Sequence, residues 1–164
     1  MYFSRLVSYF EQLEATSKRL ELFAILAELF READPSEINQ IVYLLQGELL
    51  PPFHGINIGM SEKYLLRAIA SAGQIDAGSL LAQYRLIGDL GKTAEAVIGI
   101  KTAERSETVS AVYQLIYQMA RMEGEGSVDR KIEATATLLS SATAVEAKYI
   151  ARFIAGQLRL GAGD

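Results

Sequence analysis

Residues 143–158 read TAVEAKYIARFIAGQL, and a similar pattern occurs earlier, at residues 34–49, as DPSEINQIVYLLQGEL. The two stretches align without a gap at an offset of 109 residues (143 minus 34). The matched positions include acidic, apolar and glycine residues: Glu37 with Glu146, Ile41 with Ile150, Leu44 with Phe153, Leu45 with Ile154, Gly47 with Gly156, and Leu49 with Leu158. Apolar residues at three- and four-residue spacing are typical of a helix that buries one face. The pattern therefore predicts two related helices, each followed by a glycine.

The resemblance extends on both sides of these stretches. Lys18–Glu21 matches Arg130–Glu133 after a three-residue shift, and Ile56–Gly59 matches Leu158–Gly161, with a loop at Pro51–His54 inserted in the first copy. Amphipathic helices also resemble one another by chance, but here glycines and charges match as well as apolar positions. We predict an internal repeat, residues 17–62 and 129–164, and hence two pseudo-symmetric halves.

Helical periodicity continues through the rest of the chain. The expected helices cover residues 2–15, 18–30, 34–45, 61–70, 77–84, 92–98, 106–122, 128–140 and 143–155. We expect three caps: Thr16-Ser17 before the second helix, Asp34 followed by Pro35 before the third, and Ser127 before the eighth. A loop covers residues 47–60, and no alternating run is long enough for a sheet. The predicted fold class is all-α, a compact multi-helix domain over residues 1–164.

Composition excludes several classes of function. The 164 residues contain no cysteine and one histidine, His54, so a disulfide framework and a zinc site built from cysteine and histidine ligands are excluded. Apolar runs are short and interrupted by charges, which argues against a membrane span and favours a cytoplasmic protein. The net charge is −4, but the acidic excess lies in residues 1–50, so the remainder is balanced and can still present bases on one face.

Three glycine turns beside helix starts are the candidate binding sites. A helix N-terminus offers unpaired N–H groups that suit a phosphate, glycine allows close approach, and a nearby base adds a full charge. The candidate nucleic-acid-binding residues are Gly59, Ser61 and Lys63; Gly88, Gly91 and Lys92; and Gly156, Gln157, Arg159 and Gly161. The alternative is that these glycines only end helices. We further expect Leu158 and Leu160 to turn toward the core, so that Arg159 points outward.

Five strings together resemble one known family. They are IVYLLQG at 41–47, IGMSEKYLLRAIA at 58–70, GDLG at 88–91, GEGS at 124–127 and RFIAGQLRLG at 152–161. In this order they resemble the N-terminal DNA-binding domain of archaeal-type ATP-dependent DNA ligases. The resemblance implies a non-catalytic helical domain that grips nicked double-stranded DNA along the minor groove, without sequence specificity, in replication, repair and recombination. Gly156–Gly161 would make the main groove contact, with Arg159 reaching the DNA.

The resemblance also implies what lies elsewhere in such an enzyme. The full-length ligase uses ATP and Mg²⁺ in a catalytic core, and its adenylated lysine stands in Lys-x-Asp-Gly. None of the six lysines here has that context, so we expect no catalytic residue, cofactor or metal site in this chain, and no activity from it alone.

Three further departures from the family pattern concern the C-terminal end of the domain, the residues of the groove contact and the peptide that binds a sliding clamp. The family's domain continues past the final Leu-Arg-Leu-Gly turn, so we expect this chain to lack its last helices. Gln157 stands where a basic residue is common. A sliding clamp remains a partner of the family, but residues 101–110 contain no aromatic residue, so no clamp peptide is predicted here.

Two rival interpretations stay open. One is a small enzyme in its own right, which the absence of cysteine and the single histidine disfavour without excluding it. The other is a helical protein-interaction scaffold with no nucleic-acid role, which fits the acidic charge and in which the glycine turns act only as connectors. Salt-dependent affinity for DNA would separate this scaffold from a DNA-binding domain.

Overall fold

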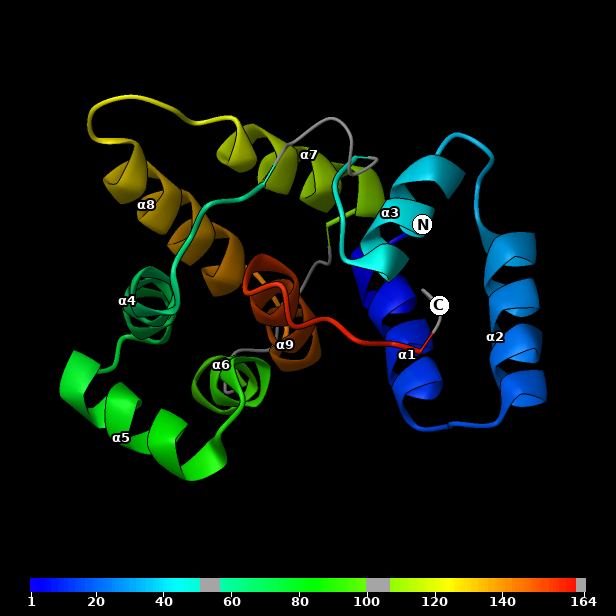
Figure 1. Ribbon diagram of the computed structural model, residues 1–164, viewed down its shortest axis with the longest axis horizontal. Helices are drawn as coiled ribbons and strands as arrows, with labels where there is room; N and C mark the ends of the chain where they lie inside the picture. The colour runs from blue at the N-terminus through cyan, green and yellow to red at the C-terminus, as the bar shows by residue number, and fades with distance from the viewer. Residues whose placement is uncertain (51–56, 100–106, 162–164) are drawn as a thin grey trace.

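The computed structural model describes residues 1–50, 57–99 and 107–161. Within these ranges the chain forms helices joined by short turns, and the only strand-like pairing is one antiparallel bridge between Tyr2 and Thr108. The helices are α1 (Phe3–Glu14), α2 (Arg19–Glu32), α3 (Ile38–Gln46), α4 (Glu62–Gly73), α5 (Ala77–Ile87), α6 (Leu90–Ile98), α7 (Val109–Ala120), α8 (Ser127–Ser140) and α9 (Ala144–Ile154). The predicted all-α class is confirmed, and Figure 1 shows the arrangement.

Helix starts differ from the predicted ones where local turns compete for the capping groups. The Asp34 carboxylate accepts from the N–H and hydroxyl of Ser36, so residues 34–37 form a turn and α3 begins at Ile38. The cap predicted at Asp34 is therefore wrong. Ser127 is the first residue of α8, after Gly126 in the left-handed region, and caps nothing; α2 likewise begins without a side-chain cap at Lys18.

Side-chain caps occur instead at helices for which none was predicted. Asp76, Asp89 and Thr108 accept from backbone N–H groups at the starts of α5, α6 and α7. Thr143 and Glu146 form a reciprocal capping box at the start of α9.

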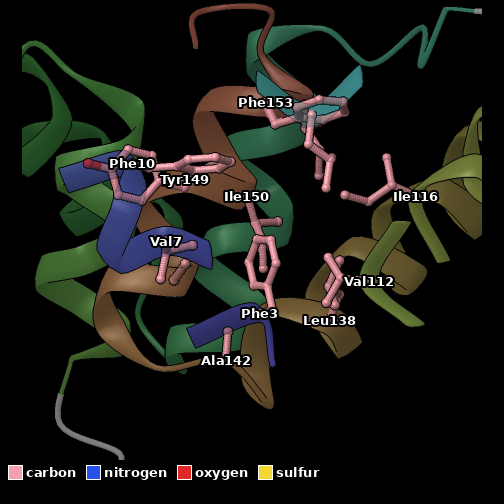
Figure 2. Close-up of a cluster of buried hydrophobic side chains, with 14 of the residues drawn as sticks. Phe3, Val7, Phe10, Val112, Ile116, Leu138, Ala142, Tyr149, Ile150 and Phe153 are labelled. Carbon is pink, nitrogen blue, oxygen red and sulfur yellow. The ribbon is translucent and has the colours of Figure 1, made fainter. Parts of the chain in front are cut away.

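The core centres on α9. All of its residues from Glu146 to Ile154 except Lys148 are buried, and it packs against α1 on one side and α6 on another. Phe10 of α1 meets Tyr149 edge to face, with ring centroids 5.4 Å apart, and Figure 2 shows the two rings within the apolar cluster. Burying one side chain such as Ile150 stabilises the fold by about 1.5–3 kcal/mol. The 143–158 stretch thus supplies the helix around which the others pack.

The first three and last three helices repeat one arrangement. α1 packs on α2 and α9, whereas α7 packs on α8 and α3. The bridge between Tyr2 and Thr108 joins the starts of α1 and α7 reciprocally, because Phe3 N–H donates to the Glu107 carbonyl (2.7 Å) and Val109 N–H to that of Met1 (2.9 Å). This geometry matches two pseudo-symmetric halves, α1–α3 and α7–α9, while their origin by duplication stays a prediction.

The ends of α3 and α9 are also alike. Gly47 and Gly156 have φ of 73° and 67°. After each helix two N–H groups bond back in the Schellman pattern: Gly47 to Leu44 and Glu48 to Tyr43 in one half, Gly156 to Phe153 and Gln157 to Arg152 in the other. The glycines aligned in the sequence therefore occupy equivalent turns.

Candidate nucleic-acid interface

The three glycine turns lie where helices begin or end: Gly59 precedes α4, Gly88 precedes α6 and Gly156 follows α9. Gly88 and Gly156 have φ of 75° and 67°, and a methyl group placed on either would meet no atom within 4 Å. These two positions therefore need glycine for its backbone conformation, and packing imposes no limit on them.

Two of the turns border one groove. It has a volume of about 530 Å³ and lies between the end of α3, the segment before α4 and the end of α9. The lining residues are Gly47–Leu50, Asn57–Met60 and Phe153–Gly156. The two halves thus contribute equivalent turns, at Gly47 and Gly156, to a shared, open depression, and Glu48 is the one charged residue among its described lining residues.

Backbone N–H groups at these turns are largely used inside the protein. Gly59 N–H donates to Asn57 Oδ1 (2.5 Å), and Lys92 N–H to Asp89 Oδ1 (2.7 Å). The N–H groups of Gly156 and Gln157 close the end of α9. Since a bonded N–H is a poor donor to a second acceptor, cationic side chains carry most of the capacity for phosphate at these turns.

The predicted cationic residues are exposed. Leu160 is buried and Leu158 half-buried, so Arg159 between them points to solvent, and the predicted orientation is confirmed. Lys63 lies exposed in the first turn of α4, after Ser61 as N-cap, and Lys92 exposed in the first turn of α6. Within the described residues none of these three cations forms an ion pair.

Gly91 has a different role from the other glycines. It is buried in the first turn of α6, and a methyl group there would lie 2.6 Å from Arg152 Cγ and 2.7 Å from the Lys148 carbonyl oxygen. Its missing side chain allows α6 to approach α9 closely. A contact of its backbone with DNA stays a prediction.

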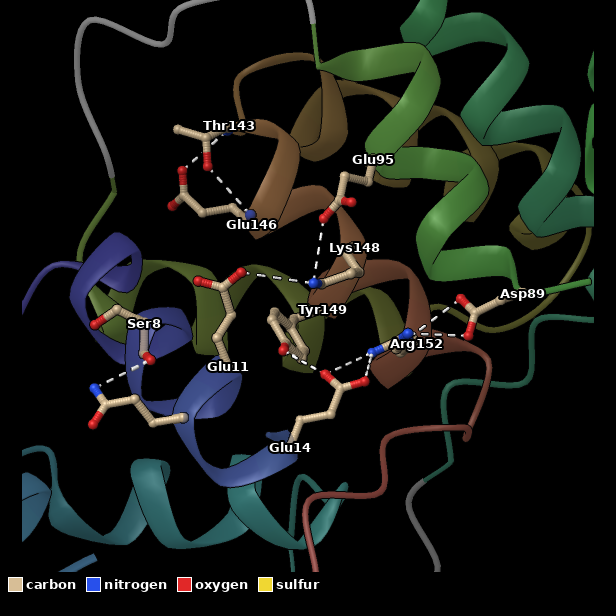
Figure 3. Close-up of polar contacts among 11 residues, drawn as sticks. Ser8, Glu11, Glu14, Asp89, Glu95, Thr143, Glu146, Lys148, Tyr149 and Arg152 are labelled. Carbon is tan, nitrogen blue, oxygen red and sulfur yellow. Dashed lines mark hydrogen bonds and ion pairs between the residues drawn. The ribbon is translucent and has the colours of Figure 1, made fainter. Parts of the chain in front are cut away.

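Sequence reasoning missed an ionic cluster around a buried arginine beside these turns, drawn in Figure 3. Arg152, 7% exposed, donates from Nη1 to Glu14 (2.8 and 3.0 Å) and from Nη2 and Nε to Asp89 (3.0 and 3.3 Å). The Tyr149 hydroxyl donates to Glu14 Oε2 at 2.6 Å. The cluster joins α1, α6 and α9, and it fixes the Gly88 turn relative to the end of α9.

The carboxylates of this cluster are held charged. Burial raises the pKa of Glu14, but the Tyr149 hydroxyl and Arg152 outweigh it and leave the pKa below its ordinary value. Burial also raises the pKa of Asp89, and the Lys92 N–H and Arg152 lower it further than burial raises it. Both groups therefore pair with Arg152 as anions at neutral pH.

Comparison with known proteins assigns the chain. The family model described as DNA ligase N terminus matches residues 2–164. The chain belongs to this family. Among relatives of this ligase N-terminal domain, the probable DNA ligase of Dictyoglomus thermophilum is 42% identical over 165 residues, covering all of this chain and 28% of that protein. The DNA ligases of Cenarchaeum symbiosum (42% over 168 residues) and Acidianus ambivalens (38% over 177) are also similar over the whole chain, which spans 28% and 30% of them.

The described part of this ligase N-terminal domain offers neither a metal site nor a membrane span. In residues 1–50, 57–99 and 107–161 there is no cluster of acidic, histidine or cysteine side chains that could hold a metal ion, and no helix both long and apolar enough to cross a bilayer. His54 and most of residues 101–110, for which no clamp peptide is predicted, lie outside the described ranges.

Proposed function

We propose that this domain is the non-catalytic DNA-binding part of an ATP-dependent DNA ligase and that it grips nicked duplex DNA through phosphates and the minor groove. The observation that carries the proposal is that Lys63, Lys92 and Arg159 are exposed beside the glycine turns and form no ion pair within the described residues. Side chains that neutralise phosphates hold a duplex without reading its sequence.

The catalytic steps belong to another part of the proposed enzyme. No lysine here stands in Lys-x-Asp-Gly, so this domain has no residue to accept AMP. We propose that ATP and Mg²⁺ act in a catalytic core, with which the domain shares a longer cytoplasmic chain. The domain's own part is to hold the duplex near that core.

Binding to nicked duplex should be weak and steeply dependent on salt. Each phosphate contact contributes about −0.9 to the slope of log affinity against log salt concentration, so three contacts should lower the affinity roughly 40-fold between 50 and 200 mM salt. At physiological salt the dissociation constant should be about 10⁻⁴ M. Fluorescence anisotropy with two duplexes of unrelated sequence measures both properties. Affinity that stays flat with salt, or that differs strongly between the sequences, would contradict the phosphate contacts.

Arg159→Ala should weaken binding by about tenfold and leave folding unchanged. The exposed guanidinium lies between two inward-facing leucines, and arginine is well suited to the focused negative potential of a minor groove. Losing one contact should also reduce the slope of affinity against salt by about one. The matched control is Arg31→Ala, an exposed arginine in the last turn of α2, which changes the net charge equally. Equal losses in the two variants would show that only net charge matters.

A further inference from the structure

Arg152 lies between two segments that carry proposed phosphate contacts, the first turn of α6 with Lys92 and the segment after α9 with Arg159. Its backbone belongs to the second of these segments. The Arg152 carbonyl oxygen accepts the N–H of Gln157 at 2.8 Å, the outer of the two bonds that end α9. The path of the chain from Gly156 toward Arg159 therefore starts from a turn that Arg152 closes.

The side chain of Arg152 holds the first segment, at the start of α6. Its Nη2 donates to Asp89 Oδ2 at 3.0 Å, and its Nε donates to Asp89 Oδ1 at 3.3 Å. The same Oδ1 accepts the N–H of Lys92 at 2.7 Å and so caps α6. Figure 3 shows Asp89 on one side of the guanidinium and Glu14 on the other. Asp89 therefore links Arg152 directly to the residue whose ammonium is a proposed phosphate contact.

The first turn of α6 also packs on the aliphatic part of the Arg152 side chain. A methyl group on Gly91 would lie 2.6 Å from Arg152 Cγ, so the backbone of α6 passes close to it. The guanidinium is anchored on α1 as well, because Nη1 donates to both carboxylate oxygens of Glu14 at 2.8 and 3.0 Å. Arg152 is only 7% exposed, which leaves too little surface for a contact with DNA. Any effect of Arg152 on DNA binding must therefore act through the groups that it holds.

Fixed positions matter for a protein that binds several phosphates at once. A duplex presents its phosphates at a regular spacing, so the cations that neutralise them must keep matching positions. If the first turn of α6 could shift relative to the end of α9, binding would have to order it, and affinity would fall. A supporting residue that holds both segments removes this cost.

We propose that Arg152 is a positioning residue for DNA binding: through Asp89 it holds the first turn of α6 so that Lys92 reaches the duplex together with Arg159. The proposal rests on the proposed function, which supplies the phosphate contact of Lys92. It separates Arg152 from a residue that only stabilises the fold, because it predicts a loss of affinity in a variant that is still folded.

Arg152→Lys tests the proposal without changing the net charge. One ammonium cannot reproduce the fork by which the guanidinium bonds both Asp89 and Glu14. Well below the Tm of the variant, the affinity for nicked duplex in fluorescence anisotropy should fall about fivefold. The slope of log affinity against log salt concentration should fall by up to about one, since a phosphate contact is lost. In a Lys92→Ala background the same substitution should leave the affinity unchanged, because the contact that Arg152 positions is already absent.

Two companion variants separate positioning from stability. Asp89→Glu alters the other partner of the same ion pair at constant charge, and it should reproduce the loss of affinity even if Arg152→Lys fails to fold. Tyr9→Phe removes the hydrogen bond that a buried tyrosine of α1 donates to Glu32 of α2. This control should lower the Tm and leave the affinity for nicked duplex unchanged.

The outcomes distinguish this proposal from the proposed function. Wild-type affinity of folded Arg152→Lys and Asp89→Glu, together with a loss for Lys92→Ala, would overturn the positioning role alone. An equal loss with and without the Lys92 side chain would also overturn it, and so would an equal loss in Tyr9→Phe. If Lys92→Ala itself left the affinity unchanged, the phosphate contact assigned to Lys92 would be wrong, and the positioning role would be wrong with it.

Discussion

Arg152→Ala is expected to destabilise the domain by about 3 kcal/mol at neutral pH, the largest effect of any single polar substitution proposed for this chain. The reason is the pair of carboxylates left behind, Glu14 and Asp89, which are held in place by one buried guanidinium. Removing one partner of a buried pair costs roughly 3–5 kcal/mol, and the low end applies because these carboxylate side chains are 39% and 32% exposed.

Thermal unfolding measures this effect. A loss of that size lowers the Tm of a domain of this length by roughly 6–12 °C. The control is Arg159→Ala, which removes an exposed arginine with no ion pair in the described part of the chain and should change stability by less than about 0.5 kcal/mol. Equal effects of the two variants would mean that the cluster adds nothing to stability.

The same cluster makes the stability difference between the wild type and Arg152→Ala depend on pH. The pKa values of Glu14 and Asp89 lie below their ordinary 4.5 and 3.8, so their contribution is complete above those values and is lost as the pH falls through the lowered ones. The gap in Tm between the wild type and Arg152→Ala should therefore narrow once the pH falls below about 4. A gap of constant size from pH 7 to pH 3 would contradict the ionic account.

Gly91→Ala is expected to cost about 2 kcal/mol, although alanine is the better helix former. The added methyl would lie 2.7 Å from the carbonyl oxygen of Lys148 and 2.6 Å from Arg152 Cγ. A backbone oxygen inside a helix cannot move aside as a side chain can, so α6 and α9 must separate. Urea unfolding of the variant measures the loss.

Gly78→Ala is the matched control for this substitution. Gly78 is also the second residue of its helix, α5, after a capping aspartate, but it is exposed, and its nearest neighbour is a side-chain atom, Asp76 Oδ2, at 3.1 Å rather than the backbone of another helix. We expect a change within about 0.5 kcal/mol there. If Gly91→Ala changed the stability as little as Gly78→Ala, close packing of α6 on α9 would not explain why glycine stands at position 91.

Local pattern predicted the helices and the family but not how the polar groups are used. The caps show why: Asp34 and Asp89 look alike in sequence, yet one binds Ser36 in a turn and the other caps α6. Likewise, Gly88 and Gly91 stand three residues apart in one string. Gly88 is needed for its left-handed backbone conformation, whereas Gly91 is needed because a side chain there would collide with α9.

The sequence by itself determined the all-helical class, the position of each helix to within a few residues, the glycine turns and membership of the ligase family. These follow from spacing within short segments, where the period of a helix and the left-handed turn act locally. Only the tertiary structure decided that Arg152 is buried between Glu14 and Asp89, which lie 138 and 63 residues away along the chain, and that Leu20 and Phe23 of α2 are exposed. Burial and ion pairing depend on which distant segments meet, and no local spacing records that.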